Sequence, residues 1–305
     1  MIAFLTRRLL STIPLLAVIV TLSFLFMRLA PGGPFDQERA LDPTVRASIE
    51  ARYGLDQSLG RQLWLYAEGL SRGDLGPSFK YTGWTVREII GQALPVSLSI
   101  GVMALGFALA MGIPLGVLGA LRHNSWIDHG AMGLALMGIC IPNFVLGPLL
   151  ILLFVFALDW LPVGGFGGFS QLILPSITLG AIRAAYIARL SRAGMLDVLQ
   201  QDFVRTARAK GLPERLVVAK HCLRLALLPV LSYLGPAVAS ILVGSVVVEK
   251  IFSIPGLGSF FVNSALNRDY TLAMGTVLLY SALLIALNLL VDIFYSILDP
   301  RMELR

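Results

Sequence analysis

The sequence predicts an all-α membrane protein with six transmembrane helices. Of its 305 residues, 56% are hydrophobic and only 14% are charged, and the mean hydropathy is +0.79, which excludes an ordinary soluble domain. Six windows of 19 to 33 residues contain no charged side chain, and a helix needs about 20 apolar residues to cross a bilayer. The apolar runs are continuous rather than alternating, which favours helices over a barrel.

These windows give the bounds of the predicted spans, which are residues 9–29, 95–119, 131–157, 173–190, 226–248 and 271–297. The first span is followed by "RLAPGG", which has no A-x-A cleavage site, so we expect a retained anchor rather than a signal peptide. The expected organisation is a tail and first helix (1–30), an external segment (31–94), a five-helix core (95–297) that includes a loop at 191–225, and a tail (298–305).

The distribution of charge predicts that both ends of the chain face the cytoplasm. Segment 183–228 holds nine Lys or Arg against three acidic residues, whereas 158–172 holds no Lys or Arg. Segment 31–95 carries seven basic and eight acidic residues and can be translocated. Because cytoplasmic loops carry the excess of basic residues, we expect an N-in, C-in chain. The net charge of +6 therefore indicates membrane orientation rather than binding of nucleic acid.

Individual residues predict short external helices, one close approach of helices and three helix kinks. In the external segment we expect two short amphipathic helices, one from Asp42 to Gly54 and one from Ser58 to Gly73. Gly112 and Gly116 have the spacing that lets two helix backbones approach closely. Kinks are expected at three prolines of the spans, Pro114, Pro142 and Pro148.

A basic stretch between two spans is the main candidate for a functional site. "DFVRTARAKG" predicts a short helix with Asp202 at its N-cap, ended by Gly211 and Pro213. Its small Ala and Thr surface with a cationic surround suits a groove on another protein better than it suits lipid. The alternative is a solvated loop whose charge only sets the orientation, and composition alone does not decide between the two.

The same stretch resembles the cytoplasmic loop of ABC importer inner-membrane permeases of the peptide/nickel branch. "DFVRTARAKGL" followed by "ALLP" carries the resemblance. Matching stretches cover nearly the whole chain, namely "RRLLSTIPLLAVIVTLSFLFMRLAPGGPF", "GDLGPSFKY", "VVVEKIFSIPGLGSFFVNSALNRDY" and the terminal "DP". The glutamate of the general Glu-Ala-Ala pattern is absent, and the aligned residues are Arg205, Thr206 and Ala207.

The resemblance implies a type I ABC importer permease fold in the bacterial inner membrane. It implies a non-catalytic permease subunit of an ATP-driven, binding-protein-dependent oligopeptide importer. The implied partners are a second permease subunit, two cytoplasmic ATPase subunits, an extracytoplasmic peptide-binding protein and the peptide, besides membrane lipid. The ATPase subunits would bind ATP, and this chain would hold no cofactor. The implied ATPase-coupling residues are Asp202, Arg205, Thr206, Ala207, Ala209, Lys210 and Gly211.

Rival functions find little support in the residues. No G-x-x-x-x-G-K-[ST] or H-E-x-x-H motif is present and the three histidines lack metal-ligand spacing, so neither catalytic nor metal-binding residues are predicted. This disfavours an intramembrane enzyme. The near absence of paired intramembrane carboxylates disfavours a secondary transporter. Dipeptide, glutathione or nickel transport within the same branch stays open.

Two further regions are candidates for the substrate path. Arg183 lies inside a predicted span, where it either attracts a peptide carboxylate or pairs within the helix bundle. Asp292 is expected to pair with a neighbouring helix rather than to relay protons. Pro255, Gly256 and Gly258 predict an external turn, with outer gating as one hypothesis and a packed re-entrant loop as the other.

Overall fold

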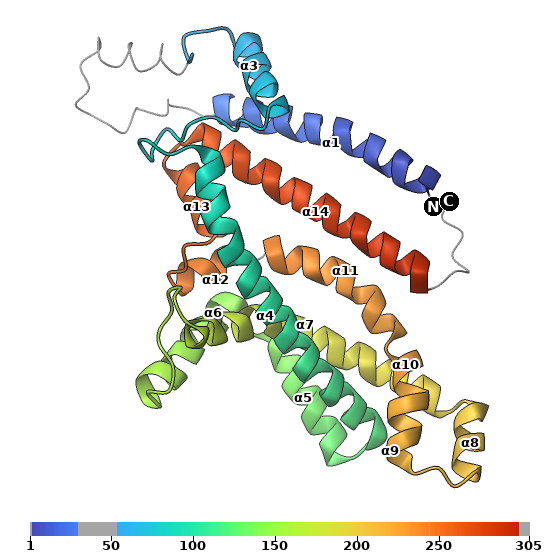
Figure 1. Ribbon diagram of the computed structural model, residues 1–305. Helices are drawn as coiled ribbons and strands as arrows, with labels where there is room; N and C mark the ends of the chain where they lie inside the picture. Colours follow the sequence, from blue (N-terminus) through green and yellow to red (C-terminus); the bar gives the residue numbers. More distant parts are fainter. Residues whose placement is uncertain (1, 30–53, 244, 299–305) are drawn as a thin grey trace. The chain divides into compact units, whose positions relative to one another are not determined.

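The computed structural model describes residues 2–29, 54–243 and 245–298, which form helices joined by turns and short loops (Figure 1). These residues fall into two compact units. Unit 1 contains the chain up to Val96 and Pro255–Leu289, and unit 2 contains Ser97–Ile254 and Leu290–Pro300. The chain thus passes between the units at Val96, at Pro255 and at Leu290.

Unit 1 is built on two long apolar helices that lie side by side, α1 (Ile2–Leu29) and α14 (Tyr270–Leu298). Phe24 of α1 and Met274 of α14 belong to one buried cluster, on which the short helix α3 (Leu59–Ser71) also packs. The predicted helix between Ser58 and Gly73 is therefore confirmed. The predicted helix from Asp42 lies outside the described residues.

A second cluster of unit 1 joins the beginning of α4 (Val86–Leu121) to α13 (Leu257–Leu266) and α14. Val86 and Leu272 are fully buried in it. A Cβ on Gly275 would come within 2.5 Å of the Val86 side chain, so α14 and α4 are in close contact there. Phe260 packs on this cluster, and its ring meets that of Tyr81 edge-on with 5.7 Å between the ring centres.

Unit 2 contains the remaining helices, with α7 packed against most of them. Their bounds are α5 (Trp126–Cys140), α6 (Asn143–Ile151), the π-helical η1 (Leu152–Ala157), α7 (Phe169–Leu199), α8 (Asp202–Ala209), α9 (Glu214–Leu216), the π-helical η2 (Val217–Cys222), α10 (Leu223–Ala226), α11 (Leu228–Val243) and α12 (Ser245–Ile251). Together with the rest of α4, these helices give α7 buried neighbours along its length.

Glycines and alanines set the close packing around α7. A Cβ on Gly112 of α4 would lie 2.7 Å from the Ala184 carbonyl oxygen, and one on Gly116 would overlap the Ala188 carbonyl oxygen. On α5, a Cβ on Gly138 would lie 2.7 Å from the Ala181 carbonyl oxygen. The prediction of close helix approach at Gly112 and Gly116 is confirmed, because only a residue without a side chain fits there.

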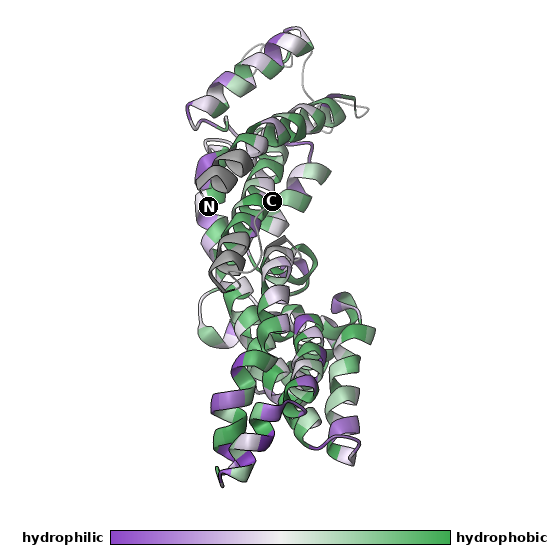
Figure 2. Cartoon of the chain, turned by 90° about the vertical axis from the view of Figure 1, so that its right-hand side faces the viewer, coloured by the Kyte–Doolittle hydropathy of each residue, from purple (hydrophilic) through white to green (hydrophobic). Residues whose placement is uncertain are grey.

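The described helices support between four and six membrane spans. Four are long and apolar enough alone, and two bent pairs qualify if each pair counts as one span. Figure 2 shows the long helices as mostly hydrophobic, with hydrophilic residues concentrated toward their ends. The six predicted windows fall on these six elements, although α4 and α7 extend well beyond the predicted bounds.

One predicted span is broken in its middle, and another begins at a sharp bend. Pro142 separates α5 from α6 with a bend of 108°, far more than the kink expected there. The predicted span 226–248 takes in α11 and most of α12, and a bend of 51° separates Leu228–Val238 from the helical segment Glu214–Ala226 before it. Both breaks stand next to a proline, which cannot donate the backbone hydrogen bond that a continuous helix needs.

Candidate functional site

The helix α8 is held on a buried cluster formed by the end of α7, by η2 and by α10. Val204 and Ala207 point into this cluster from α8, and Met195, Cys222 and Ala226 meet them from the other elements. Val204 is fully buried and Ala207 is 7% exposed. Because residues three apart lie on one face of a helix, these two anchor the inner face of α8. We call this cluster the α8 base.

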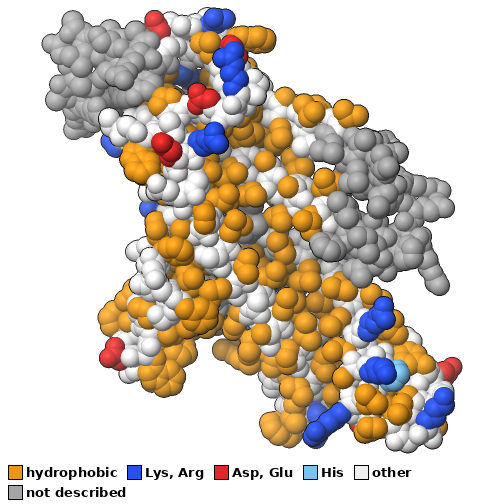
Figure 3. Space-filling view, in the orientation of Figure 1, with side chains coloured by type: hydrophobic (Ala, Val, Ile, Leu, Met, Phe, Trp, Pro, Cys, Tyr) orange, Lys and Arg blue, Asp and Glu red, His pale blue; other side chains and the backbone are white. Residues whose placement is uncertain are grey.

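The opposite face of α8 is polar and open. Asp202, Arg205, Thr206, Ala209 and Lys210 are exposed. Arg205 contacts Asp202 at 3.4 Å with side chains 74% and 95% exposed, so this ion pair contributes little to stability. Figure 3 shows Lys and Arg side chains gathered over α8 to α10. The result is a cationic face on a rigid support.

The turn after α8 is fixed by backbone geometry and by one ion pair. Gly211 adopts φ +75°, the left-handed conformation that glycine accepts most readily, so it ends the helix as predicted. Arg208 donates two hydrogen bonds to Glu214 of α9, at 2.6 and 3.1 Å. These hydrogen bonds raise the pKa of the Arg208 guanidinium. The corner between α8 and α9 is therefore clamped by a bidentate pair.

Two predictions about α8 need correction. Asp202 is the first helical residue, and Gln201 stands at the N-cap instead. Ala207 does not belong to the small exposed surface, because it faces the α8 base. The contribution of the seven predicted coupling residues to ATPase binding stays a prediction.

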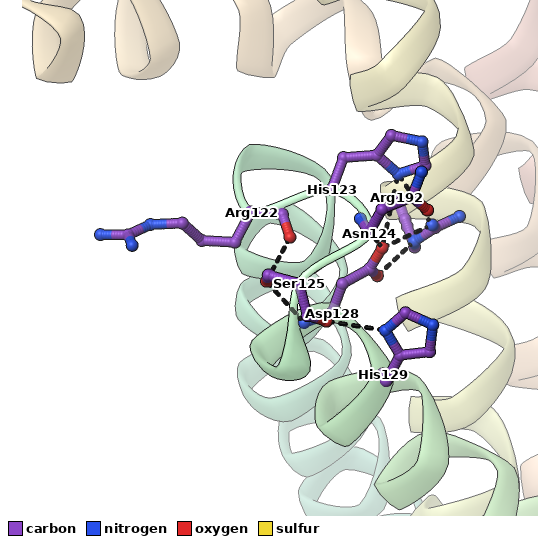
Figure 4. A network of polar contacts seen from close by, with 7 residues as sticks. All are labelled: Arg122, His123, Asn124, Ser125, Asp128, His129 and Arg192. Carbon is purple, nitrogen blue, oxygen red and sulfur yellow. Dashed lines mark hydrogen bonds and ion pairs between the residues drawn. The ribbon is translucent and has the colours of Figure 1, made fainter.

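A polar network ties the turn between α4 and α5 to α7, the helix that precedes α8 (Figure 4). Asp128 is 2% exposed and accepts hydrogen bonds from Arg192 Nε at 2.6 Å and Nη2 at 2.7 Å. The backbone N–H of Asn124 donates to the same carboxylate at 3.0 Å. His123 lies 3.4 Å from it. This network was missed in the sequence, where Asp128 only marked the end of an uncharged window and Arg192 was only counted among the basic residues of segment 183–228.

Two other buried carboxylates were also missed. Glu249 of α12 is fully buried and accepts a hydrogen bond from Ser97 Oγ of α4 at 2.7 Å. Asp269 precedes α14 and accepts hydrogen bonds from Ser78 Oγ and from the backbone N–H groups of Phe79 and Lys80. Asp269 thereby holds the "GPSFKY" loop, one of the stretches that carried the family resemblance. In the sequence, Glu249 and Asp269 each stand at the end of an uncharged window. Nothing in that position shows whether the side chain is buried.

The predicted substrate-path residues lie in different surroundings. Arg183 donates to Tyr233 Oη of α11 at 3.2 Å, a contact with a neutral phenol and not with a carboxylate. Pro255 is exposed and Gly256 precedes α13, as a turn requires. Gly258 does not belong to that turn, because it is buried inside α13. The side chain of Asp292 lies outside what the structure describes.

Residues 112–304 match the family model described as "Binding-protein-dependent transport system inner membrane component". This match takes in α7, the α8 base and the exposed face of α8. The chain belongs to this family. With its apolar helices, this inner membrane component is a multi-pass protein of the inner membrane.

Relatives of this inner membrane component match over its whole length. The oligopeptide transport system permease protein OppB of Haemophilus influenzae is 47% identical over 305 residues, which cover 99% of this chain and 100% of the relative. OppB of Escherichia coli K12 is 46% identical with the same coverage. The dipeptide transport system permease protein DppB of Bacillus subtilis is 45% identical, with 94% of this chain and 93% of the relative covered.

Solved structures with the same fold are ABC transporters. One chain of an amino acid ABC transporter crystallised with histidines has a TM-score of 0.52 at 17% identity, and the match covers 68% of this chain and 93% of that chain. The inward-facing MetNI methionine ABC transporter has a TM-score of 0.54 at 17% identity, with 67% and 95% covered. This inner membrane component therefore has the type I ABC importer permease fold, as predicted.

Proposed function

We propose that this chain is a permease subunit of an ATP-driven oligopeptide importer and forms half of its translocation pathway. Full-length identity of 46–47% to proteins named as oligopeptide permeases supports this substrate class. Dipeptides are the second candidate, because the dipeptide permease of Bacillus subtilis is almost as similar. The chain itself performs no catalysis and holds no cofactor, and ATP is bound and hydrolysed by separate subunits.

The proposed assembly contains four further proteins. A second permease subunit completes the pathway, two cytoplasmic ATPase subunits drive it, and an extracytoplasmic peptide-binding protein delivers the substrate. Both ends of this chain face the cytoplasm in the proposal, and so does α8. The excess of Lys and Arg between residues 183 and 228 supports this orientation.

The observation that carries the proposal is the contrast between the two faces of α8. One face is buried in the α8 base, and the other presents Arg205, Thr206 and Ala209 to solvent. A short helix whose polar face is exposed is suited to a groove on a partner, in which it acts as a rigid contact point. Because α8 follows α7 directly, a displacement of α8 acts on the helix against which most of unit 2 packs.

The remaining predicted site residues keep their proposed roles. Pro255, Gly256 and Gly258 lie where the chain enters unit 1, and we assign them to outer gating. Arg183 is assigned to the substrate path, where the hydrogen bond to Tyr233 would hold its guanidinium in place.

A charge reversal on α8 tests the proposal. Arg205→Glu is expected to weaken association with the ATPase subunits by about tenfold or more, while insertion and folding are unchanged, since Arg205 is exposed. Arg122→Glu is the matched control, because Arg122 is exposed on the turn between α4 and α5, which the proposal also places in the cytoplasm. The measurement is co-purification of the ATPase subunits with each variant, together with peptide uptake. Equal association for both variants would contradict the proposal.

A further inference from the structure

A cavity of about 210 Å³ lies within unit 1, between the C-terminal end of α1, α3 and the beginning of α14. Its volume is far above the roughly 10–15 Å³ that one water needs. Its lining combines aromatic rings with a guanidinium, a phenol and an amide, contributed by Phe24, Arg28, Gln62, Tyr66, Phe79 and Tyr270. It is separate from α8 and from the candidate substrate-path residues.

Arg28 supplies the positive charge of this cavity. Its guanidinium carbon lies 5.6 Å from the ring centre of Phe24 and 5.2 Å from that of Tyr270. Within the described part of the chain, no carboxylate forms an ion pair with Arg28. A guanidinium stacked between two rings keeps its N–H donors available, and its planar fork matches the geometry of a phosphate.

Two of the residues that line the cavity each carry a buried polar atom with no hydrogen-bond partner among the described residues. They are Tyr66 Oη and Gln62 Oε1. Burial raises the pKa of Tyr66 to about 12, so the phenol remains protonated and can donate. Gln62 is 9% exposed, and its Nε2 donates to the carbonyl oxygens of Leu55 and Gln57, which fixes Oε1 as the free acceptor. A buried donor and a buried acceptor without partners indicate a missing polar ligand.

The position of the cavity identifies the class of ligand. Arg28 lies in the last turn of α1, whose residues Leu10–Leu29 form a candidate membrane span, so it stands at the level of a lipid headgroup. The neighbouring side chains Phe26 and Leu29 are 70% and 73% exposed, as apolar residues facing acyl chains would be. An anion there is most directly supplied by the membrane itself.

We propose that this cavity binds the headgroup of a phospholipid that carries both a phosphate and a hydrogen-bond donor, such as phosphoethanolamine. Arg28 and Tyr66 donate to the phosphate oxygens. Gln62 Oε1 accepts from the ammonium group. The bound lipid joins α1, α3 and α14 at the membrane surface. This proposal depends on the membrane location of the chain and not on the transported substrate.

The test uses the full chain, purified in a neutral detergent and titrated with short-chain lipids while thermal unfolding is followed. Phosphatidylethanolamine is expected to raise the melting temperature, because a ligand that binds only the folded state stabilises it. Arg28→Gln is expected to weaken the apparent affinity by about tenfold or more, since it removes the charge-assisted hydrogen bonds to the phosphate. Tyr66→Phe, which removes only the hydroxyl group and keeps the ring, is expected to weaken it by several fold. Arg72→Gln is the matched control, because Arg72 is exposed and pairs with Glu68 outside the cavity.

Further additives test whether a different molecule with a phosphate or an amine could occupy the same cavity. Diacylglycerol, inorganic phosphate and a tripeptide are expected to produce no comparable shift, and phosphatidylcholine, which lacks an N–H donor, is expected to produce a smaller one. The proposal is overturned if Arg28→Gln and Tyr66→Phe both respond to phosphatidylethanolamine as the parent protein does. It is also overturned if phosphatidylcholine or inorganic phosphate stabilises the parent protein equally.

Discussion

Arg192 donates two hydrogen bonds to the buried carboxylate of Asp128, across 64 residues of sequence. Through this pair the turn between α4 and α5 is fixed to α7, about two helical turns before the end of that helix. A movement that begins at α8 is therefore not confined to α7. It would reach the end of α4 and the beginning of α5 through a contact that is polar, directional and largely shielded from water.

Removing this pair is expected to destabilise unit 2. Asp128→Ala should lower the free energy of unfolding by roughly 2–3 kcal/mol, because it deletes two charge-assisted hydrogen bonds and leaves Arg192 only partly exposed to water. Thermal or denaturant unfolding in detergent measures the effect. In the proposed transporter, ATP hydrolysis should also become less dependent on peptide delivery.

The exposed ion pair between Arg72 and Glu68 provides the comparison. Glu68→Ala is expected to cost no more than about 1 kcal/mol, because both partners of that pair are well solvated. If the two variants unfold alike, the Asp128 pair is not the strong contact inferred here. A double-mutant cycle with Arg192→Ala then isolates the pairwise energy.

Substitutions of two alanines of α8 distinguish its packing on the α8 base from its docking on the ATPase subunits. Ala207→Glu places a charge in the α8 base and should cost about 3 kcal/mol or more of stability. Ala209→Glu introduces the same side chain on the exposed face and should change stability by less than about 0.5 kcal/mol. Both variants should lose ATPase subunits in co-purification, but only the first should unfold at a lower temperature. Retention of the ATPase subunits by Ala209→Glu would mean that this face is not the docking surface.

The spans could be predicted from the sequence because crossing a bilayer requires a long uncharged run, and that requirement is local. The end of α8 at Gly211 could also be predicted from the local sequence, since it depends on the backbone preference of one residue. The 108° bend at Pro142 was not predictable in size, because a proline only removes a hydrogen bond and the surrounding helices set the angle.

The inward orientation of Ala207 could have been found from its spacing to Val204, which places both on the face opposite Arg205. The prediction that the Ala and Thr residues form an exposed surface did not take this spacing into account. The pairing of Asp128 with Arg192 had no such signal, because it depends on how α5 packs against α7. Buried carboxylates such as Glu249 and Asp269 look like surface charges in a sequence until the fold brings Ser97 or Ser78 against them.

The loop held by Asp269 should loosen when the carboxylate is removed. Asp269→Ala leaves Ser78 Oγ and the N–H groups of Phe79 and Lys80 without an acceptor in a site that is 1% exposed, at a cost of roughly 3 kcal/mol. Limited proteolysis between Pro77 and Tyr81 should become faster. Asp74→Ala is the control, because Asp74 is exposed and accepts only from the Gly76 N–H among the described contacts. Similar proteolysis rates for the two variants would contradict the role of Asp269.

Two glycines of α4 should respond in opposite directions to the same substitution. Gly116→Ala would drive a methyl group against the Ala188 carbonyl oxygen and the Ser191 side chain, so we expect a loss of roughly 1–3 kcal/mol as α4 is pushed from α7. Gly106 lies on the same helix with nothing within 4 Å of its Cβ position, so Gly106→Ala should stabilise α4 by up to about 1 kcal/mol. Thermal unfolding of the two variants beside the parent protein measures both. A stabilising effect of Gly116→Ala would show that α4 and α7 do not approach at this glycine, and the path from α8 to α4 would then depend on the Asp128 contact alone.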